Sequence, residues 1–144
     1  MLYGVRLRSE EAPSQAFLEA AIEEVTRGNV GYFFEEWQAG REPPCCLGCA
    51  EIRHLPDEPA AVTEIVGARD VLTRGAASCQ SAAAYYAGRE RALALWNGAD
   101  PQTAEVQHRV VLEPRHHPHA PEGYWHALVV TPEGVKDVTE EMDT

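Results

Sequence analysis

The segment of residues 79–96, CQSAAAYYAGRERALALW, constrains the fold of this chain more than any other. Small or apolar side chains recur there at the spacing of one helix face, i, i+3, i+4 and i+7. These residues are Cys79, Ala82, Ala83 and Tyr86. Ser78 precedes them, and a serine oxygen at that position accepts a hydrogen bond from a backbone N–H of the first helical turn. The segment therefore predicts a helix that begins at Cys79.

The N-terminal half combines alternating and helical apolar patterns with frequent turn residues. Tyr3, Val5 and Leu7 alternate with small or charged neighbours, which predicts a strand with one buried face. The other elements expected before residue 76 are a helix over 14–27 with Ser14 as N-cap and Gly28 just past its end, a second helix over 32–38, irregular chain over 40–59 with a short strand at 50–55, and a helix-rich segment over 60–74 that ends at Gly75.

Residues with high β propensity dominate the C-terminal part. Residues 104–114 and the run YWHALVV at 124–130 both predict strands. TPEG is a turn sequence, and VKDVT at 135–139 is expected to be the returning strand. Helices thus precede strands, which predicts an α+β fold in which N-terminal helices pack on a small antiparallel sheet.

Length and charge narrow the classes of function. A chain of 144 residues suits one domain, 1–144, and its 23 acidic against 12 basic residues give a net charge of −11. Such a charge repels phosphate backbones, so we expect no nucleic-acid partner. The sequence has no apolar stretch long enough to cross a membrane, and its start does not resemble a signal peptide. We expect a soluble protein, cytoplasmic or virion-associated, without a membrane partner.

Three residues of the types that thiol chemistry requires lie on suitable predicted elements. Cys79 at a helix start would meet unpaired backbone N–H groups, which favour the thiolate and can help to stabilise an oxyanion. A nucleophile needs a base, and the base needs a group that orients it. His126 lies in a predicted strand and Asp137 in the strand that returns after the turn. The three residues therefore form a candidate Cys-His-Asp triad.

The local sequences RGAASC, WHALV and KDVT, in this order, resemble the transglutaminase-like superfamily of papain-type thiol enzymes. The stretch IRHLPDEPAAVTEIVGARDVLTRG is similar to the segment that leads into the cysteine in small phage-associated members. The resemblance spans residues 52–139 and implies a papain/transglutaminase-like core with Cys79 as nucleophile, His126 as general base and Asp137 as the residue that holds the imidazole. It implies a cysteine peptidase, amidase or transglutaminase-like enzyme of phage or prophage origin. Such an enzyme acts on a peptide or protein and needs no cofactor or metal.

The length of the TPEG turn decides whether the aspartate can support the histidine. A two- or four-residue loop places Asp137 diagonally across from His126 on one face of the hairpin. A three-residue loop turns Asp137 to the other face and brings Glu140 opposite His126 instead. We expect the first arrangement, with one ring nitrogen bonded to Asp137 and the other directed towards the sulfur of Cys79.

Structural interpretations of the same residues remain open. A cysteine in an alanine-rich helix is often a packing residue, a strand histidine is often part of the core, and an aspartate can simply end a strand. The alternative function is therefore a non-catalytic structural or adaptor component of a phage particle or tail. It would use the same fold and have phage structural proteins as its partners.

A second group of cysteines lies in the proline-rich segment. Cys45, Cys46 and Cys49 form a CCxxC sequence, and His54 follows five residues later. Thiolates at this spacing can share a zinc ion, but a second pair of ligands is missing from the sequence. A structural metal in a small interaction module, a disulfide and free thiols are the three alternatives. We expect no stoichiometric zinc.

Overall fold

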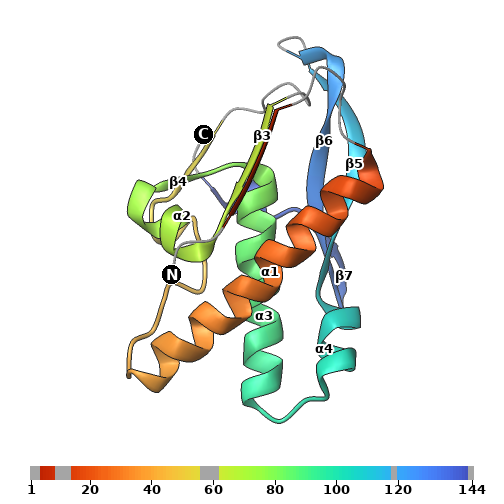
Figure 1. Ribbon diagram of the computed structural model, residues 1–144. Helices are drawn as coiled ribbons and strands as arrows, with labels where there is room; N and C mark the ends of the chain where they lie inside the picture. Colours follow the sequence, from red (N-terminus) through yellow and green to blue (C-terminus); the bar gives the residue numbers. More distant parts are fainter. Residues whose placement is uncertain (1–3, 9–13, 56–61, 118–119, 143–144) are drawn as a thin grey trace.

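The computed structural model describes residues 4–8, 14–55, 62–117 and 120–142, and these form an α+β fold (Figure 1). Two long helices form its centre: α1 spans Gln15–Gln38 and α3 spans Cys79–Trp96. They pack closely, because Gly88 of α3 lies against Asn29 of α1, where a Cβ on the glycine would come within 2.5 Å of the asparagine Cβ. The absence of a side chain at residue 88 therefore allows the two helix backbones to approach.

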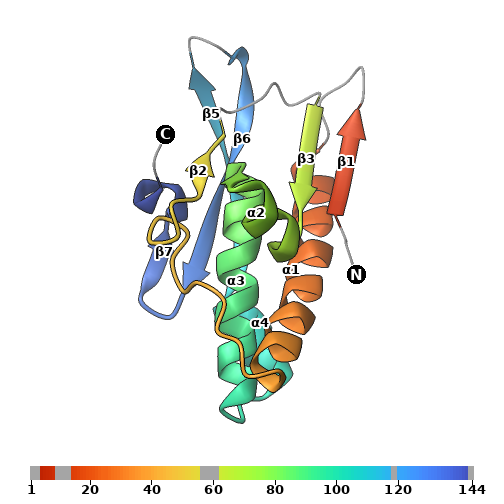
Figure 2. The ribbon, with the colours of Figure 1, turned by 90° about the vertical axis from the view of Figure 1, so that its left-hand side faces the viewer.

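A three-stranded antiparallel sheet covers the other side of α3. Its strands are β5 (Arg109–His117), β6 (Ala120–Thr131) and β7 (Gly134–Lys136), in the order β5-β6-β7. Figure 2 shows α3 with this sheet on one side and α1 on the other. Buried side chains from both helices and from the sheet form one apolar cluster around α3, which includes Phe33, Tyr85 and Val129.

Two smaller strand pairs and three short helices complete the described chain. Strand β1 (Gly4–Arg8) pairs antiparallel with β3 (Val62–Val66) (Figure 2), and β2 (Arg53–His54) pairs parallel with β4 (Ala76–Ala77). The short helices are α2 (Ala68–Arg74), α4 (Pro101–Gln107) and the 3-10 helix η1 (Val138–Glu141). The pairing of β2 with β4 brings the proline-rich segment beside the residues that lead into Cys79.

Several sequence expectations are confirmed. Ser78 and Ser14 both cap their helices, with Ser14 accepting a hydrogen bond from the Phe17 backbone N–H. Strands occur at 4–8 and 120–131, the turn follows Thr131, and the proline-rich segment, as far as it is described (40–55), has only the two-residue strand β2. The predicted residues 2 and 3 of the first strand lie outside the described part of the chain.

The predicted end of the first helix is wrong. Helix α1 does not stop near Gly28 but continues to Gln38, and so includes the second helix expected over 32–38. The buried face of the helix continues beyond Gly28. Phe33 is fully buried, and Asn29 accepts a hydrogen bond from the backbone N–H of Ala68 at 2.8 Å. These contacts outweigh the cost of a helical glycine, which is about 1 kcal/mol.

Three other boundaries also differ from the prediction. The helix-rich segment expected over 60–74 contains strand β3 before α2, because four of its five residues are β-branched and pair with β1. Residues 104–107 are helical, since Asp100 caps α4 and Pro101 occupies its first position. The returning strand ends at Lys136, so Asp137 is not within a strand but forms the N-cap of η1.

In the described residues, no helix has the length and apolar character needed to cross a bilayer.

Candidate functional site

Cys79 is the first residue of α3 and is held there by a network of serine hydroxyls. The Ser78 side chain accepts a hydrogen bond from the backbone N–H of Ser81, and the two hydroxyl oxygens lie 3.1 Å apart. Ser81 in turn accepts a hydrogen bond from the backbone N–H of Val66 in β3. The start of the helix is thus fixed to the neighbouring strand, and Cys79 is only 2% exposed.

The start of α3 also contacts β6 next to the candidate histidine. The backbone oxygen of Trp125 accepts a hydrogen bond from the side-chain amide of Gln80 at 3.0 Å. The thiol of Cys79 donates a longer hydrogen bond to the same oxygen, with Sγ 3.8 Å away. Since Trp125 directly precedes His126, these two contacts hold Cys79 beside the strand that carries the histidine.

His126 and Asp137 form a direct hydrogen bond. The Nε2 atom of His126 lies 2.8 Å from Oδ2 of Asp137, and the histidine is 3% exposed. The other ring nitrogen, Nδ1, is buried and has no hydrogen-bond partner among the described residues. The aspartate is fixed on its other oxygen, because Oδ1 accepts hydrogen bonds from the backbone N–H and the hydroxyl of Thr139 at 3.1 and 2.7 Å.

The geometry of the turn explains why the aspartate reaches the ring. Thr131 pairs with Gly134 and Val129 with Lys136, so the loop contains two residues. Gly134 has φ of +128°, a conformation that residues with a Cβ rarely adopt. This is the register expected from the sequence, and the predicted hydrogen bond between His126 and Asp137 is confirmed.

Asp137 is held in its ionised form. Burial raises the pKa of its carboxyl group, but hydrogen bonds from Thr139 and His126 outweigh this effect and leave the pKa below its ordinary value of 3.8. Arg115 adds a cation near the carboxylate, with Nη1 3.8 Å from Oδ2. An ionised Asp137 accepts a hydrogen bond from the ring N–H, and it stabilises a positively charged imidazole.

Thr139 and Arg115 contact Asp137, and Gln80 donates a hydrogen bond to the Trp125 carbonyl beside His126; the sequence analysis identified none of the three. Arg115 lies two residues after Glu113, which pairs directly with His126 across β5 and β6, so the three side chains share one face of the sheet. The charge alternation at 113 and 115 was visible in the sequence, but its relation to the histidine required the strand register. Gln80 and Thr139 had no signal beyond their closeness to Cys79 and Asp137.

The second cysteine group occupies an irregular segment between α1 and β2. None of the four cysteines forms a disulfide bond, and the backbone N–H of Cys49 lies 3.4 Å from the sulfur of Cys46. Among the residues that the structure describes, no group of three or more histidine, cysteine or carboxylate side chains is placed to hold a metal ion. His54 belongs to the short strand β2.

No protein-family model, curated protein sequence or solved structure matches this chain. The similarity to the transglutaminase-like superfamily therefore depends on the local sequences around Cys79, His126 and Asp137. What the structure adds is a buried histidine bonded to a carboxylate, and a cysteine at a helix start that contacts the backbone oxygen of Trp125, the residue before that histidine.

Proposed function

We propose that this chain is a thiol acyl-transfer enzyme, a cysteine peptidase, amidase or transglutaminase-like protein. Cys79 is its nucleophile, His126 its general base and Asp137 the residue that orients the base. The observation that carries the proposal is the buried His126–Asp137 pair, which binds through Nε2 and leaves Nδ1 without a partner among the described residues. Buried polar atoms usually have a hydrogen-bond partner, so the unpartnered Nδ1 beside a bonded Nε2 supports a role as a proton acceptor.

The hydrogen bond to Asp137 sets the tautomer of the ring. A carboxylate can only accept, so the proton of a neutral His126 resides on Nε2 and the lone pair on Nδ1. A lone pair on the buried side of the ring is what a general base for a nearby thiol requires. The contacts of Cys79 and Gln80 with the Trp125 carbonyl hold the start of α3 beside the residue that precedes His126, which supports the choice of Cys79 as that thiol.

The proposed reaction follows from these roles. Nδ1 of His126 takes the thiol proton, and the thiolate of Cys79 attacks the carbonyl carbon of an amide. The carbonyl oxygen becomes an oxyanion, which the first backbone N–H groups of α3 stabilise. The tetrahedral intermediate collapses when the imidazolium returns the proton to the leaving amine. Water or a second amine then attacks the thioester, with His126 again as the base, and the free thiol is restored.

The order and packing of the elements support the finer fold assignment that we propose, a papain/transglutaminase-like core. A central helix carries the cysteine at its first residue and packs against an antiparallel sheet. The histidine lies on the middle strand of that sheet, and the aspartate follows the next strand after a tight turn. We propose a peptide or protein substrate and a phage or prophage origin, for which the support is the sequence resemblance alone.

One observation favours the alternative, a non-catalytic structural or adaptor component of a phage particle or tail. Cys79 is 2% exposed, and its thiol faces a backbone carbonyl. A nucleophile must be reached by its substrate, so the two functions differ in the accessibility of this sulfur. The experiment that separates them is therefore a measurement of Cys79 reactivity.

Brief treatment with iodoacetamide near pH 6, followed by peptide mapping, tests the proposal. An ordinary thiol with a pKa of about 8.5 is almost wholly protonated at this pH. We expect Cys79 to be alkylated before Cys45, Cys46 and Cys49, which serve as internal controls. The His126→Gln variant should lose this preference while it keeps the circular dichroism spectrum of the wild type. Equal or slower labelling of Cys79 in the wild type would favour the adaptor function.

A further inference from the structure

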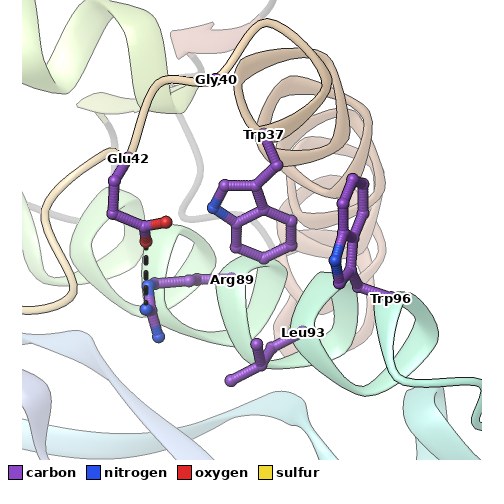
Figure 3. Close-up of a pocket in the computed structure, with 6 residues that line it drawn as sticks. All are labelled: Trp37, Gly40, Glu42, Arg89, Leu93 and Trp96. Carbon is purple, nitrogen blue, oxygen red and sulfur yellow. Dashed lines mark ion pairs between the residues drawn. The ribbon is translucent and has the colours of Figure 1, made fainter.

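A second candidate site lies at the far end of the two long helices. It is an open pocket of about 480 Å³ between the C-terminal end of α1, the segment that follows it and the second half of α3 (Figure 3). The residues that line it are Trp37, Gly40, Glu42, Arg89, Leu93 and Trp96. Its volume falls within the range of small-molecule sites, and its lining combines aromatic and charged side chains.

Arg89 contributes a guanidinium with one underused edge. The Nη1 atom donates a hydrogen bond to Glu90 at 3.3 Å. On the opposite edge, Nη2 is 3.5 Å from the carboxylate of Glu42, and Nε is buried without a hydrogen-bond partner among the described residues. The edge formed by Nε and Nη2 is one that binds a carboxylate through two parallel hydrogen bonds. Glu42 occupies this edge only at ion-pair distance.

Trp37 supplies a third donor in the same pocket. Its indole nitrogen is buried and, like Nε of Arg89, has no hydrogen-bond partner in the described part of the chain. Figure 3 shows this nitrogen on the side of the ring that faces Glu42 and Arg89. Buried donors are rarely left without an acceptor, because each costs free energy comparable to a lost hydrogen bond. The indole N–H beside the Nε and Nη2 edge of Arg89 makes three donors in one pocket, and they indicate a site for acceptor oxygens.

The remaining wall of the pocket is apolar. The rings of Trp37 and Trp96 pack edge to face with centroids 5.5 Å apart, and Trp96 is 47% exposed. Leu93 lies below them on α3 (Figure 3). An exposed indole beside a leucine favours contact with an apolar or aromatic group.

We propose that this pocket binds a small carboxylate with an apolar or aromatic body. The ligand carboxylate displaces that of Glu42 from the Nε and Nη2 edge of Arg89, and one of its oxygens also accepts the indole N–H of Trp37. The apolar body packs against Trp96 and Leu93. The side chain of Glu42 is 67% exposed, so its displacement from a 3.5 Å contact costs little.

This proposal does not depend on the acyl-transfer function. Arg89 follows Cys79 by ten residues on the same helix, which corresponds to about 15 Å along the axis. The pocket residues include no member of the candidate triad. Binding can therefore be measured whether or not the chain is an enzyme.

Titration with N-acetyl-L-phenylalanine, followed by the indole signals in ¹H–¹⁵N NMR spectra, tests the proposal. The uncharged amide of the same compound is the matched control. We expect saturable binding of the carboxylate with a shift of the Trp37 indole signal, and little or no binding of the amide. Trp37→Phe, which assigns that signal, should bind more weakly because it keeps a ring but loses the N–H.

Two charge variants give opposite expectations. Arg89→Lys keeps the charge but loses the two-donor edge, and should weaken binding about tenfold. Glu42→Gln removes the competing carboxylate and should tighten binding about threefold. Equal affinity for the acid and the amide, an unshifted Trp37 signal, or weaker binding in Glu42→Gln would each overturn the proposal.

Discussion

Replacing Asp137 by asparagine separates the charge of this residue from its shape. In the wild type, Oδ2 accepts from Nε2 of His126, while Oδ1 accepts from both the N–H and the hydroxyl of Thr139. An asparagine has one oxygen and one NH₂ group, so it can satisfy only one of these sides. Two donors face the Thr139 side and one faces the histidine side. We therefore expect the amide oxygen to face Thr139 and the NH₂ group to face the ring.

The orientation of the amide determines the protonation of His126. With an NH₂ group opposite Nε2, the ring avoids a contact between two donors only if Nε2 becomes the acceptor and the proton moves to Nδ1. The general base would then carry a proton on the nitrogen that has to accept one. Asp137→Asn should consequently lower the alkylation rate of Cys79 near pH 6, although the side chain keeps almost the same volume.

The cost to stability should be moderate. The substitution removes the charge from three hydrogen bonds, and charge-assisted bonds are about twice as strong as neutral ones. The two bonds to Thr139 and, after the proton shift, the contact with His126 survive in weakened form. We expect the free energy of unfolding to fall by about 2 kcal/mol, within the range for the loss of a hydrogen bond to a charged group.

The pH dependence of stability gives a second signature. Because the pKa of Asp137 is lower in the folded chain than its ordinary value of 3.8, its carboxylate stabilises the fold fully above that value. This contribution is lost as the pH falls through the lower pKa of the folded state. Asp137→Asn should lack it, so the difference in unfolding free energy between wild type and variant should shrink on acidification below about pH 4.

Three measurements test the predicted effects of Asp137→Asn. They are Cys79 alkylation at pH 6, ¹⁵N spectra that report the tautomer of His126, and urea unfolding from pH 7 to pH 3. Glu140→Gln is the matched control, because it removes an exposed carboxylate three residues away. It should leave the tautomer and the alkylation rate unchanged. If Asp137→Asn retained the proton on Nε2 and the wild-type alkylation rate, Asp137 would have no part in orienting the base.

Two further predictions concern the packing of α3. Gly88→Ala should lower the free energy of unfolding by about 1–3 kcal/mol, because the new Cβ would meet Asn29 at 2.5 Å. Gly31→Ala is the control: a Cβ there has nothing within 4 Å, so the free energy of unfolding should rise by about 0.5–1 kcal/mol. Urea unfolding measures both changes. Arg91→Met should cost about 3 kcal/mol in the same assay, since Arg91 is 2% exposed and donates two hydrogen bonds of 2.6 Å to Glu23, which is itself 30% exposed. No loss on Gly88→Ala, or none on Arg91→Met, would mean that the corresponding contact does not constrain the helix.

Local signals were the reliable part of the sequence. The caps at Ser14 and Ser78 depend on a side chain and a backbone N–H only three residues away, so the start of each long helix could be predicted. The end of α1 could not. It depends on Phe33 being buried and on Asn29 meeting Ala68, which is 39 residues further along the chain.

Strand β3 was also mispredicted because it depends on contacts distant in sequence. Residues 62–66 were expected to be part of a helix-rich segment, and their pairing with β1 joins segments almost sixty residues apart. The pocket at Trp37 and Arg89 had no signal in the sequence either, because it forms where the ends of two helices meet. A single sequence contains little information on contacts between residues that are distant along the chain.

The candidate triad combines a contact between residues near in sequence with one between residues distant in sequence. His126 and Asp137 are eleven residues apart within one hairpin, and a two-residue turn is enough to bring them to the same face. Cys79 is 46 residues from Trp125, and their contact requires α4, the β5–β6 pairing and the packing of α3 on the sheet to be correct at once. Gln80 reinforces that contact from the helix side. The orienting half of the proposed triad is thus specified locally, whereas the placement of the nucleophile is a property of the whole fold. Variants that loosen the packing of α3, such as Gly88→Ala, should therefore reduce the reactivity of Cys79 without breaking the hydrogen bond between His126 and Asp137.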